Sequence, residues 1–290
     1  MRPLRFPPFS PCDSVVAVAA KKEKKVVSKQ DKPTNVVAAA RAGTGGSGLS
    51  MRRIWNGTKS LAGTVAIFLL LRTFLIEAYR IPSGSMIPSL LIGDWLFVNK
   101  LRYGPHVPFT AINLPGYAEP TRGEVVVFES PYQADEVARG DDGTPTLVKR
   151  LIGMPLDTIY MRDAVVYVNG LAQRQGFTSA EQEPGDPNEV SDLFDWQKKV
   201  GLTASRFGAA PAQPTHDNWG PFIVPAGHFF MMGDNRYQSK DSRYWGFVPR
   251  KNVRGRPLFV YYSYVTGAES DRVLPFLTDI RWGRIGHWIH

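Results

Sequence analysis

The segment GDWLFVNK, residues 93–100, is rich in aromatic and aliphatic side chains and begins at a glycine, a pattern typical of a short buried strand. Segments of the same kind recur along the chain, separated by Gly, Pro and Asn. No long helical pattern lies between them, so the sequence predicts a mostly β fold with an antiparallel sheet and not a parallel α/β fold. The other predicted strands are GEVVVFES (123–130), TLVKRLIG (146–153), AVVYVNG (164–170), GHFFMMGD (227–234) and PLFVYYSYV (257–265).

The predicted strands belong to one β domain, residues 80–290, which is interrupted by a polar stretch. Residues 171–218 are polar and rich in Pro and Gly. We expect this stretch to form an inserted polar subdomain or a large loop on the β core.

An apolar stretch precedes the β domain: LAGTVAIFLLLRTFLIEAY, residues 61–79. As a helix, these nineteen residues would span about 28 Å, close to the hydrocarbon thickness of a bilayer. Arg72 interrupts the stretch toward its C-terminal end, from which its side chain could reach the interface. Residues 54–79 are therefore predicted to hold one transmembrane helix with its flank. The alternatives are a buried core helix and a helix that lies in the membrane interface.

Positive charge is concentrated at the N-terminus. Residues 1–60 carry twelve Lys and Arg against three Asp and Glu, which accounts for the whole net charge of +9. The remainder of the chain is balanced, which argues against nucleic-acid binding. A basic flank before an apolar run predicts a cytoplasmic N-terminus and an external C-terminal domain. Residues 1–53 are predicted to be a disordered tail, with a transit peptide or an anionic-lipid-binding segment as alternatives.

Two serines, Ser83 and Ser85, flank a glycine directly after the apolar stretch, in IPSGSMIPSL (81–90). A serine there could be a nucleophile if a base lay nearby, although Ser-Gly-Ser is also a common turn. None of the five histidines lies in a triad motif, and no Cys or His cluster suggests a metal. Lys149 lies in the apolar strand TLVKRLIG, where burial would lower its pKa; a strand-edge lysine that reaches water is the equal alternative. A third segment, GDNRYQSKDSRYWGFVP (233–249), could be catalytic or only a salt-bridged loop.

These segments, in this order after an apolar span, resemble the motif boxes of bacterial signal peptidase I. PSGSMIPSLLIGDWLFVNK (82–100) is similar to the nucleophile box and RGEVVVFESP (122–131) to the following strand. VKRLIGMPLD (148–157) resembles the lysine box, residues 233–249 the last box, and RWGRIGHWIH (281–290) the end of the family's chains. The resemblance covers about residues 60–290.

The resemblance implies a role for each matching residue. Ser85 would be the nucleophile and Lys149 the general base. The hydroxyl of Ser83 and the main-chain N–H of Ser85 would form the oxyanion hole, and Ser239 would orient the Lys149 amine. Asp241 and Arg243 would pair and brace the last box. Small apolar substrate pockets, suited to Ala-x-Ala, would be lined by Ile81, Pro82, Met86, Leu90, Leu96, Val127, Leu147 and Val148.

Three residues depart from the family pattern. Tyr237 and Gln238 stand where the last box usually has Asp-Asn, and Leu156 stands where the lysine box usually has glycine. None of these departures touches the expected nucleophile or base, but each puts the local turn geometry in question.

The resemblance implies a single-pass enzyme of the cytoplasmic (inner) membrane that removes signal peptides from exported preproteins. The expected partners are signal peptides and membrane lipid, without nucleic acid, and the chain would act as a monomer. No metal or organic cofactor is implied. The alternatives are a self-cleaving Ser/Lys peptidase of the repressor type, for which residues 1–60 lack a helix-turn-helix, and an inactive β scaffold tethered to the membrane.

Overall fold

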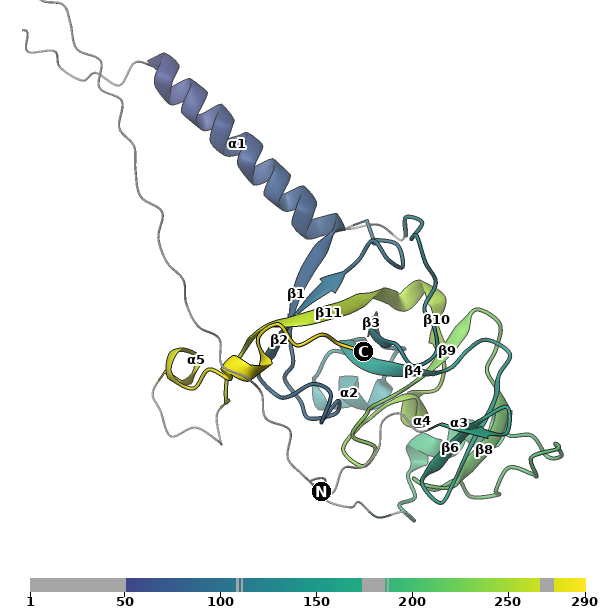
Figure 1. Cartoon of the computed structure of the whole chain (residues 1–290). Coiled ribbons are helices and arrows are strands. Elements are labelled where there is room, and N and C mark those ends of the chain that lie inside the picture. Colours follow the sequence, from purple (N-terminus) through teal and green to yellow (C-terminus); the bar gives the residue numbers. More distant parts are fainter. Residues whose placement is uncertain (1–50, 108–109, 111, 174–185, 187, 267–273) are drawn as a thin grey trace, which may run out of the picture. The chain divides into compact units, whose positions relative to one another are not determined.

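The computed structural model describes residues 51–107, 110, 112–173, 186, 188–266 and 274–290. Residues 51–290 form one compact unit. The predicted disordered tail, residues 1–53, lies almost wholly outside the described residues, as does part of the polar stretch 171–218. The unit is built mainly from β-strands that pair antiparallel throughout, which confirms the predicted antiparallel β fold of the domain (Figure 1).

The larger of two sheets has seven strands in the order β1-β2-β11-β3-β4-β9-β10. Its order departs from chain order because the late strand β11 lies between β2 and β3, which ties the C-terminal part of the chain into the centre of the sheet. The strands are β1 (Ile76–Arg80), β2 (Asp94–Asn99), β3 (Val125–Glu129), β4 (Thr146–Gly153), β9 (His228–Met232), β10 (Val248–Pro249) and β11 (Val253–Ser263).

The smaller sheet has four strands in the order β7-β6-β5-β8 and is drawn at the lower right of Figure 1. The polar stretch 171–218 supplies only β7 among the described strands, so the sheet is drawn mainly from residues on either side of that stretch. A buried apolar cluster that includes Trp219 and Phe222 joins the two sheets through Phe230 of β9. The strands are β5 (Thr158–Arg162), β6 (Val165–Val168), β7 (Leu171–Ala172) and β8 (Trp219–Ile223).

Helices are short, apart from the first. Helix α1 extends from Met51 to Phe74. The others are α2 (Ala134–Arg139), α3 (Asp195–Val200), α4 (Ser242–Trp245) and α5 (Pro275–Thr278), with 3-10 helices at Asp192–Phe194, Arg250–Asn252 and Trp282–Arg284.

The region predicted to be one helix through Tyr79 is divided between two elements. Helix α1 ends at Phe74, and Ile76–Arg80 form the edge strand β1, which pairs with β2. The assignment of residues 76–79 to the helix is therefore wrong: Glu77 and Tyr79 alternate with exposed neighbours, as strand residues do. Within the described part of the chain, no helix combines the length and apolarity needed to cross a membrane.

A hydrophobic core underlies the segment that carries the candidate nucleophile. Met86 and Leu90, from the turn that follows β1, are buried against Leu96 of β2 and Val127 of β3. The same cluster includes Ile289, near the end of the sequence. The turn that presents Ser85 is thus held from below by apolar side chains of the central strands.

Leu156, which stands where the family pattern has glycine, adopts a backbone conformation that favours glycine. Residues Met154–Asp157 form a β-turn closed by the Asp157 N–H, with Pro155 at its second position and Leu156 at its third. Leu156 has φ 69°, in the left-handed region that favours glycine, and its side chain is 71% exposed. The chain therefore keeps the turn geometry that a glycine would give, with a strained leucine in its place.

Leu156→Gly should raise the free energy of unfolding by about 0.5–1 kcal/mol, because it relieves backbone strain without removing a buried contact. Leu156→Ala is the matched control and should give no such gain, since alanine keeps the Cβ atom that disfavours this conformation. Urea unfolding of the three proteins measures the difference. Equal stability of the glycine and alanine variants would contradict the strain argument.

Candidate active site

Ser85 and Lys149 meet in the structure although they are far apart in the sequence. The Lys149 amine donates a hydrogen bond of 2.5 Å to the Ser85 hydroxyl. Ser85 lies in the turn between β1 and β2, and Lys149 lies in β4, opposite Val126 of β3. Both side chains are buried: Ser85 is 8% exposed and Lys149 3%. A hydroxyl and an amine at this distance can exchange a proton directly.

Burial governs the protonation of Lys149. Loss of hydration lowers the pKa of its amine from 10.5 to about 8. Among the nearby charges, Asp241 and Asp234 raise this pKa and Arg243 lowers it. A substantial share of the amine is therefore neutral at mildly alkaline pH, and a neutral amine can accept a proton.

The two side chains lie at a small cavity of about 70 Å³. Of the predicted substrate-pocket residues, five line it and three do not: Leu90, Leu96 and Val127 lie in the hydrophobic core behind it, fully buried. Ser83 also lines the cavity and is exposed. The cavity is lined by Tyr79, Arg80, Ile81, Pro82, Ser83, Ser85, Met86, Thr146, Leu147, Val148 and Lys149.

The loop after β9 brings Ser239 and Asp241 beside this pair. Arg243 binds Asp241 with two hydrogen bonds of 2.9 Å between fully buried groups. Burial raises the pKa of Asp241, but the charge and hydrogen bonds of Arg243 outweigh it, so that this pKa lies below its usual value. Asp241 also accepts a hydrogen bond of 3.0 Å from the N–H of Gly233. The ionised Asp241 carboxylate, bound by both Arg243 and the Gly233 N–H, thus fixes the loop.

Gly233 allows the loop to approach the turn that carries Ser85. A Cβ atom there would lie 2.2 Å from the Ser239 hydroxyl and 2.5 Å from the Ser85 carbonyl oxygen, closer than such atoms can pack. Ser239 is buried, and among the described residues its hydroxyl has no hydrogen-bond partner. The predicted bond from Ser239 to the Lys149 amine is therefore not formed in this structure, although both groups lie beside the same turn.

Sequence reasoning missed the residues that hold the turn carrying Ser85. The N–H of Asn235 donates to the carbonyl of Ser85 at 3.1 Å, and its side-chain amide donates to the carbonyl of Gly84 at 3.2 Å. Arg150, next to Lys149, donates two hydrogen bonds of 2.7 Å to Asp234. Ser89, at the far end of the turn, donates to the same carboxylate at 2.5 Å. Only the charge of Arg150 and Asp234 was visible in the sequence; their pairing was not.

The departure at Tyr237 is compensated by residues of the polar stretch. The Tyr237 ring stacks on His216, with ring centres 5.0 Å apart, and its hydroxyl donates to Asp217 at 3.1 Å. His216 is buried and also contacts Asp217 through its Nδ1, at 2.5 Å. Gln238 accepts a hydrogen bond of 3.3 Å from Asn235. The altered loop therefore gains its own support, part of it from the end of the 171–218 stretch.

No metal site accompanies this arrangement in the described ranges, where no three His, Cys, Asp or Glu side chains cluster closely enough to hold an ion.

Known proteins resemble this chain over the part that carries the site. A family model described as signal peptidase, peptidase S26, matches residues 54–262. A signal peptidase I of Pseudomonas fluorescens is 35% identical over 224 residues, covering 71% of this chain and 72% of that protein. A signal peptidase I of Pseudomonas aeruginosa is 34% identical over 217 residues, with the same coverage. A crystal structure of a signal peptidase I from Enterococcus faecalis is 28% identical and covers 48% of this chain and 96% of that one, with a TM-score of 0.28.

Burial of Lys149 should be measurable as a cost to stability. Its pKa is about 8 in the folded chain against 10.5 for a free lysine, so between these values the unfolded chain binds more protons. The free energy of unfolding should therefore rise as the pH increases from about 8 to about 10.5. Lys149→Met removes the buried charge and should raise the free energy of unfolding at pH 7 by about 1–3 kcal/mol, with a smaller gain near pH 10.

Urea unfolding at pH 7 and pH 10 measures both effects. Lys251→Met, at an exposed position, is the matched control and should leave the pH dependence of the wild type intact. A Lys149→Met protein that is less stable than the wild type at pH 7 would contradict the argument that burial of the Lys149 amine lowers the free energy of unfolding.

Proposed function

Because the chain belongs to the signal peptidase family, peptidase S26, we propose that Ser85 and Lys149 are the catalytic pair of a serine endopeptidase that removes signal peptides. The observation that carries the proposal is the hydrogen bond of 2.5 Å between the Lys149 amine and the Ser85 hydroxyl, both buried beside a small cavity. An amine whose pKa is lowered by burial can activate a serine without a histidine.

The proposed reaction has two stages. The neutral Lys149 amine takes the Ser85 proton while Oγ attacks the scissile carbonyl carbon, and the resulting ammonium then gives that proton to the leaving amine. An acyl-enzyme ester on Ser85 remains. Water then attacks the ester with Lys149 again as base, and the freed serine recovers its proton. Each stage begins and ends with a neutral Lys149 amine. The lowered pKa of Lys149 therefore favours both stages.

The tetrahedral intermediate requires donors to its oxyanion. We assign this role to the main-chain N–H of Ser85 and to the hydroxyl of Ser83, which lines the same cavity. Ser239, Asp241 and Arg243 would act through Lys149. The unpartnered Ser239 hydroxyl is available to bind the amine once the Ser85 proton has moved, and Asp241 favours the ammonium that then forms.

The cavity also supports a preference for Ala-x-Ala. A volume of about 70 Å³ suits a small side chain. Among the described residues, main-chain groups at its edges have no strand partner and can bind an extended peptide. β1 is an edge strand, and the first half of β4 pairs only with β3, because pairing with β9 begins at Arg150. A substrate strand can add to these edges and place alternate side chains toward the cavity.

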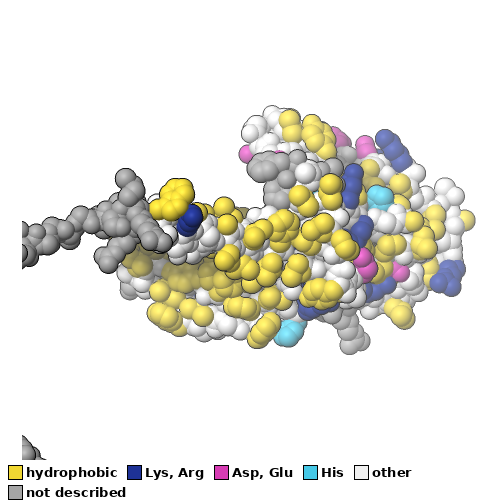
Figure 2. Space-filling model, turned by 90° about the horizontal axis from the view of Figure 1, so that it is seen from above, with side chains coloured by type: hydrophobic (Ala, Val, Ile, Leu, Met, Phe, Trp, Pro, Cys, Tyr) yellow, Lys and Arg dark blue, Asp and Glu magenta, His cyan; other side chains and the backbone are white. Residues whose placement is uncertain are grey.

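We further propose that the enzyme works at the cytoplasmic membrane, with its N-terminus inside and its β domain outside. Much of the face seen in Figure 2 is hydrophobic. Support comes from the exposed apolar residues of α1, such as Leu61 (65% exposed) and Phe68 (59%), and from the excess positive charge of residues 1–60. In sealed inside-out vesicles, the β domain should resist added protease; digestion there would contradict this orientation.

The catalytic assignment predicts a graded series of variants. With a purified preprotein carrying an Ala-x-Ala site, Ser85→Ala should abolish cleavage, and Ser83→Ala should slow it by about 10²–10³-fold, as loss of one oxyanion donor does. Lys149→Arg should be inactive, because a guanidinium stays protonated. Mass spectrometry of the products locates the cut and gives the rate.

Ser60→Ala is the control: it removes an exposed hydroxyl on α1 that does not line the cavity. It should retain most of the activity. Cleavage at the wild-type rate by Ser85→Ala or Lys149→Arg would show that other residues perform the chemistry.

A further inference from the structure

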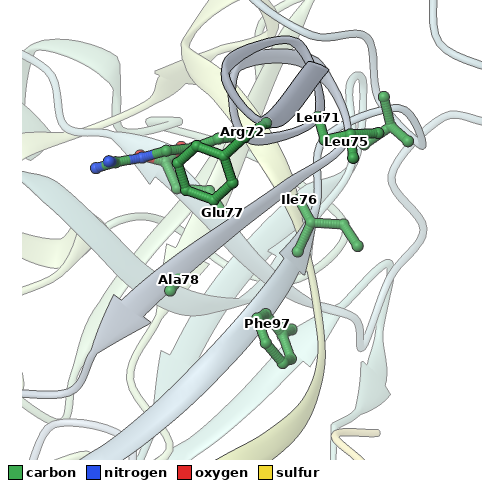
Figure 3. A pocket seen from close by; sticks show the side chains of 8 residues that line it. Leu71, Arg72, Leu75, Ile76, Glu77, Ala78 and Phe97 are labelled. Atoms are coloured by element: carbon green, nitrogen blue, oxygen red, sulfur yellow. The ribbon is translucent and has the colours of Figure 1, made fainter. Parts of the chain in front are cut away.

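A second, larger cavity lies at the opposite end of β1 from Ser85. Its volume is about 490 Å³, within the range of sites that take sizeable ligands. Figure 3 shows Leu71 and Leu75 near the end of α1, with Ile76, Ala78 and Phe97 on the adjoining strands. Most of the lining is apolar: it comprises Phe68, Leu71, Arg72, Leu75, Ile76, Glu77, Ala78 and Phe97.

The cavity is open, and its side chains are left without cover. Leu71 is 49% exposed and Ile76 46%. Two charged residues, Glu77 and Arg72, lie at the margin of the cavity. Glu77 forms an ion pair with Lys100 at 3.1 Å, and the Arg72 side chain extends to one side in Figure 3. Exposed apolar surface that is concentrated in a hollow indicates an apolar binding partner.

β1 connects this cavity directly to the Ser85 cavity. Ile76 and Ala78 line the first, and Arg80 and Ile81 line the second. At about 3.3 Å per residue, the five steps from Ile76 to Ile81 cover about 16 Å. The outer edge of β1 is unpaired in the described sheet, so an extended peptide added there would pass both cavities. Such a peptide would run in the direction of β1, with its cleavage site at the Ser85 end.

We propose that the large cavity binds the apolar segment of the signal peptide, as a specificity site separate from the small cavity at Ser85. The inference rests on the proposed function. A signal peptide carries about 7–15 apolar residues shortly before its small-residue cleavage site. About five extended residues before the cut would bring the end of that segment beside Ile76 and Ala78. A lipid acyl chain could also fill an apolar hollow, but it could not use the free main-chain edge of β1, which joins the two cavities.

Ala78→Trp tests the proposal, because it fills the cavity from a position opposite Phe97 and does not line the Ser85 cavity. The purified full chain in detergent is assayed on a preprotein and on a short peptide with the same cleavage sequence but without the apolar segment. Ala78→Trp should raise KM for the preprotein about tenfold or more and leave kcat/KM for the short peptide within about twofold. Activity on the short peptide also reports that the variant is folded.

A second variant and a matched control use α1. Leu71→Asp places a carboxylate in the cavity and should show the same selective loss. Leu69→Asp changes a residue of similar exposure (51%) on the same helix that does not line the cavity, and should behave as the wild type.

Three results would overturn the proposal. In one, the preprotein keeps its wild-type KM in both cavity variants. In the second, both substrates lose activity alike, as expected if lipid or detergent occupied the cavity to support the fold. In the third, the wild type cuts neither substrate, which would overturn the proposed function as well, whereas the first two leave that function standing.

Discussion

The burial of one lysine amine against one serine hydroxyl is the constraint on which the rest of this structure depends. Removal of Lys149 from water lowers its pKa to about 8, and the same burial disfavours the charge that a lysine would otherwise carry. The hydrogen bond to Ser85 places the amine beside a hydroxyl, a partner that carries no charge. A lysine with a lowered pKa is thus obtained at a cost to folding, which the remaining contacts must offset.

The surrounding elements keep these two groups together. The central strands bury the base of the turn that carries Ser85, and Asn235 binds its backbone. The Arg150–Asp234 pair ties β4, which carries Lys149, to the loop after β9. The same loop carries Asp241, whose negative charge limits the fall in the pKa of Lys149, while Arg243 acts in the opposite direction. The pKa of the amine is therefore a balance between burial and a fixed ion pair, and not an effect of burial alone.

Local patterns predicted much of the fold, but they left the roles of Ser85 and Lys149 open. Strands such as 146–153 were visible from their apolar composition, and the family resemblance selected Ser85 and Lys149. β1 was missed because IEAYR continues an apolar run, so only its pairing with β2 distinguishes it from helix. The clamps were missed because they join distant positions: Asn235 to Ser85, and Tyr237 to His216 and Asp217. Leu156 shows a third limit of sequence reasoning: it has the positive φ expected of glycine at this family position, although the residue is a leucine.

The central claim is that the working base is a buried lysine that must be neutral. The pH dependence of kcat/KM on a short peptide tests it most directly, because this ratio reports the ionisation of the free enzyme. The account predicts that kcat/KM rises with pH through an apparent pKa near 8, the value for the folded Lys149. A rise centred near 6.5, the ordinary value for histidine, or near the free-lysine value of about 10.4, would contradict it.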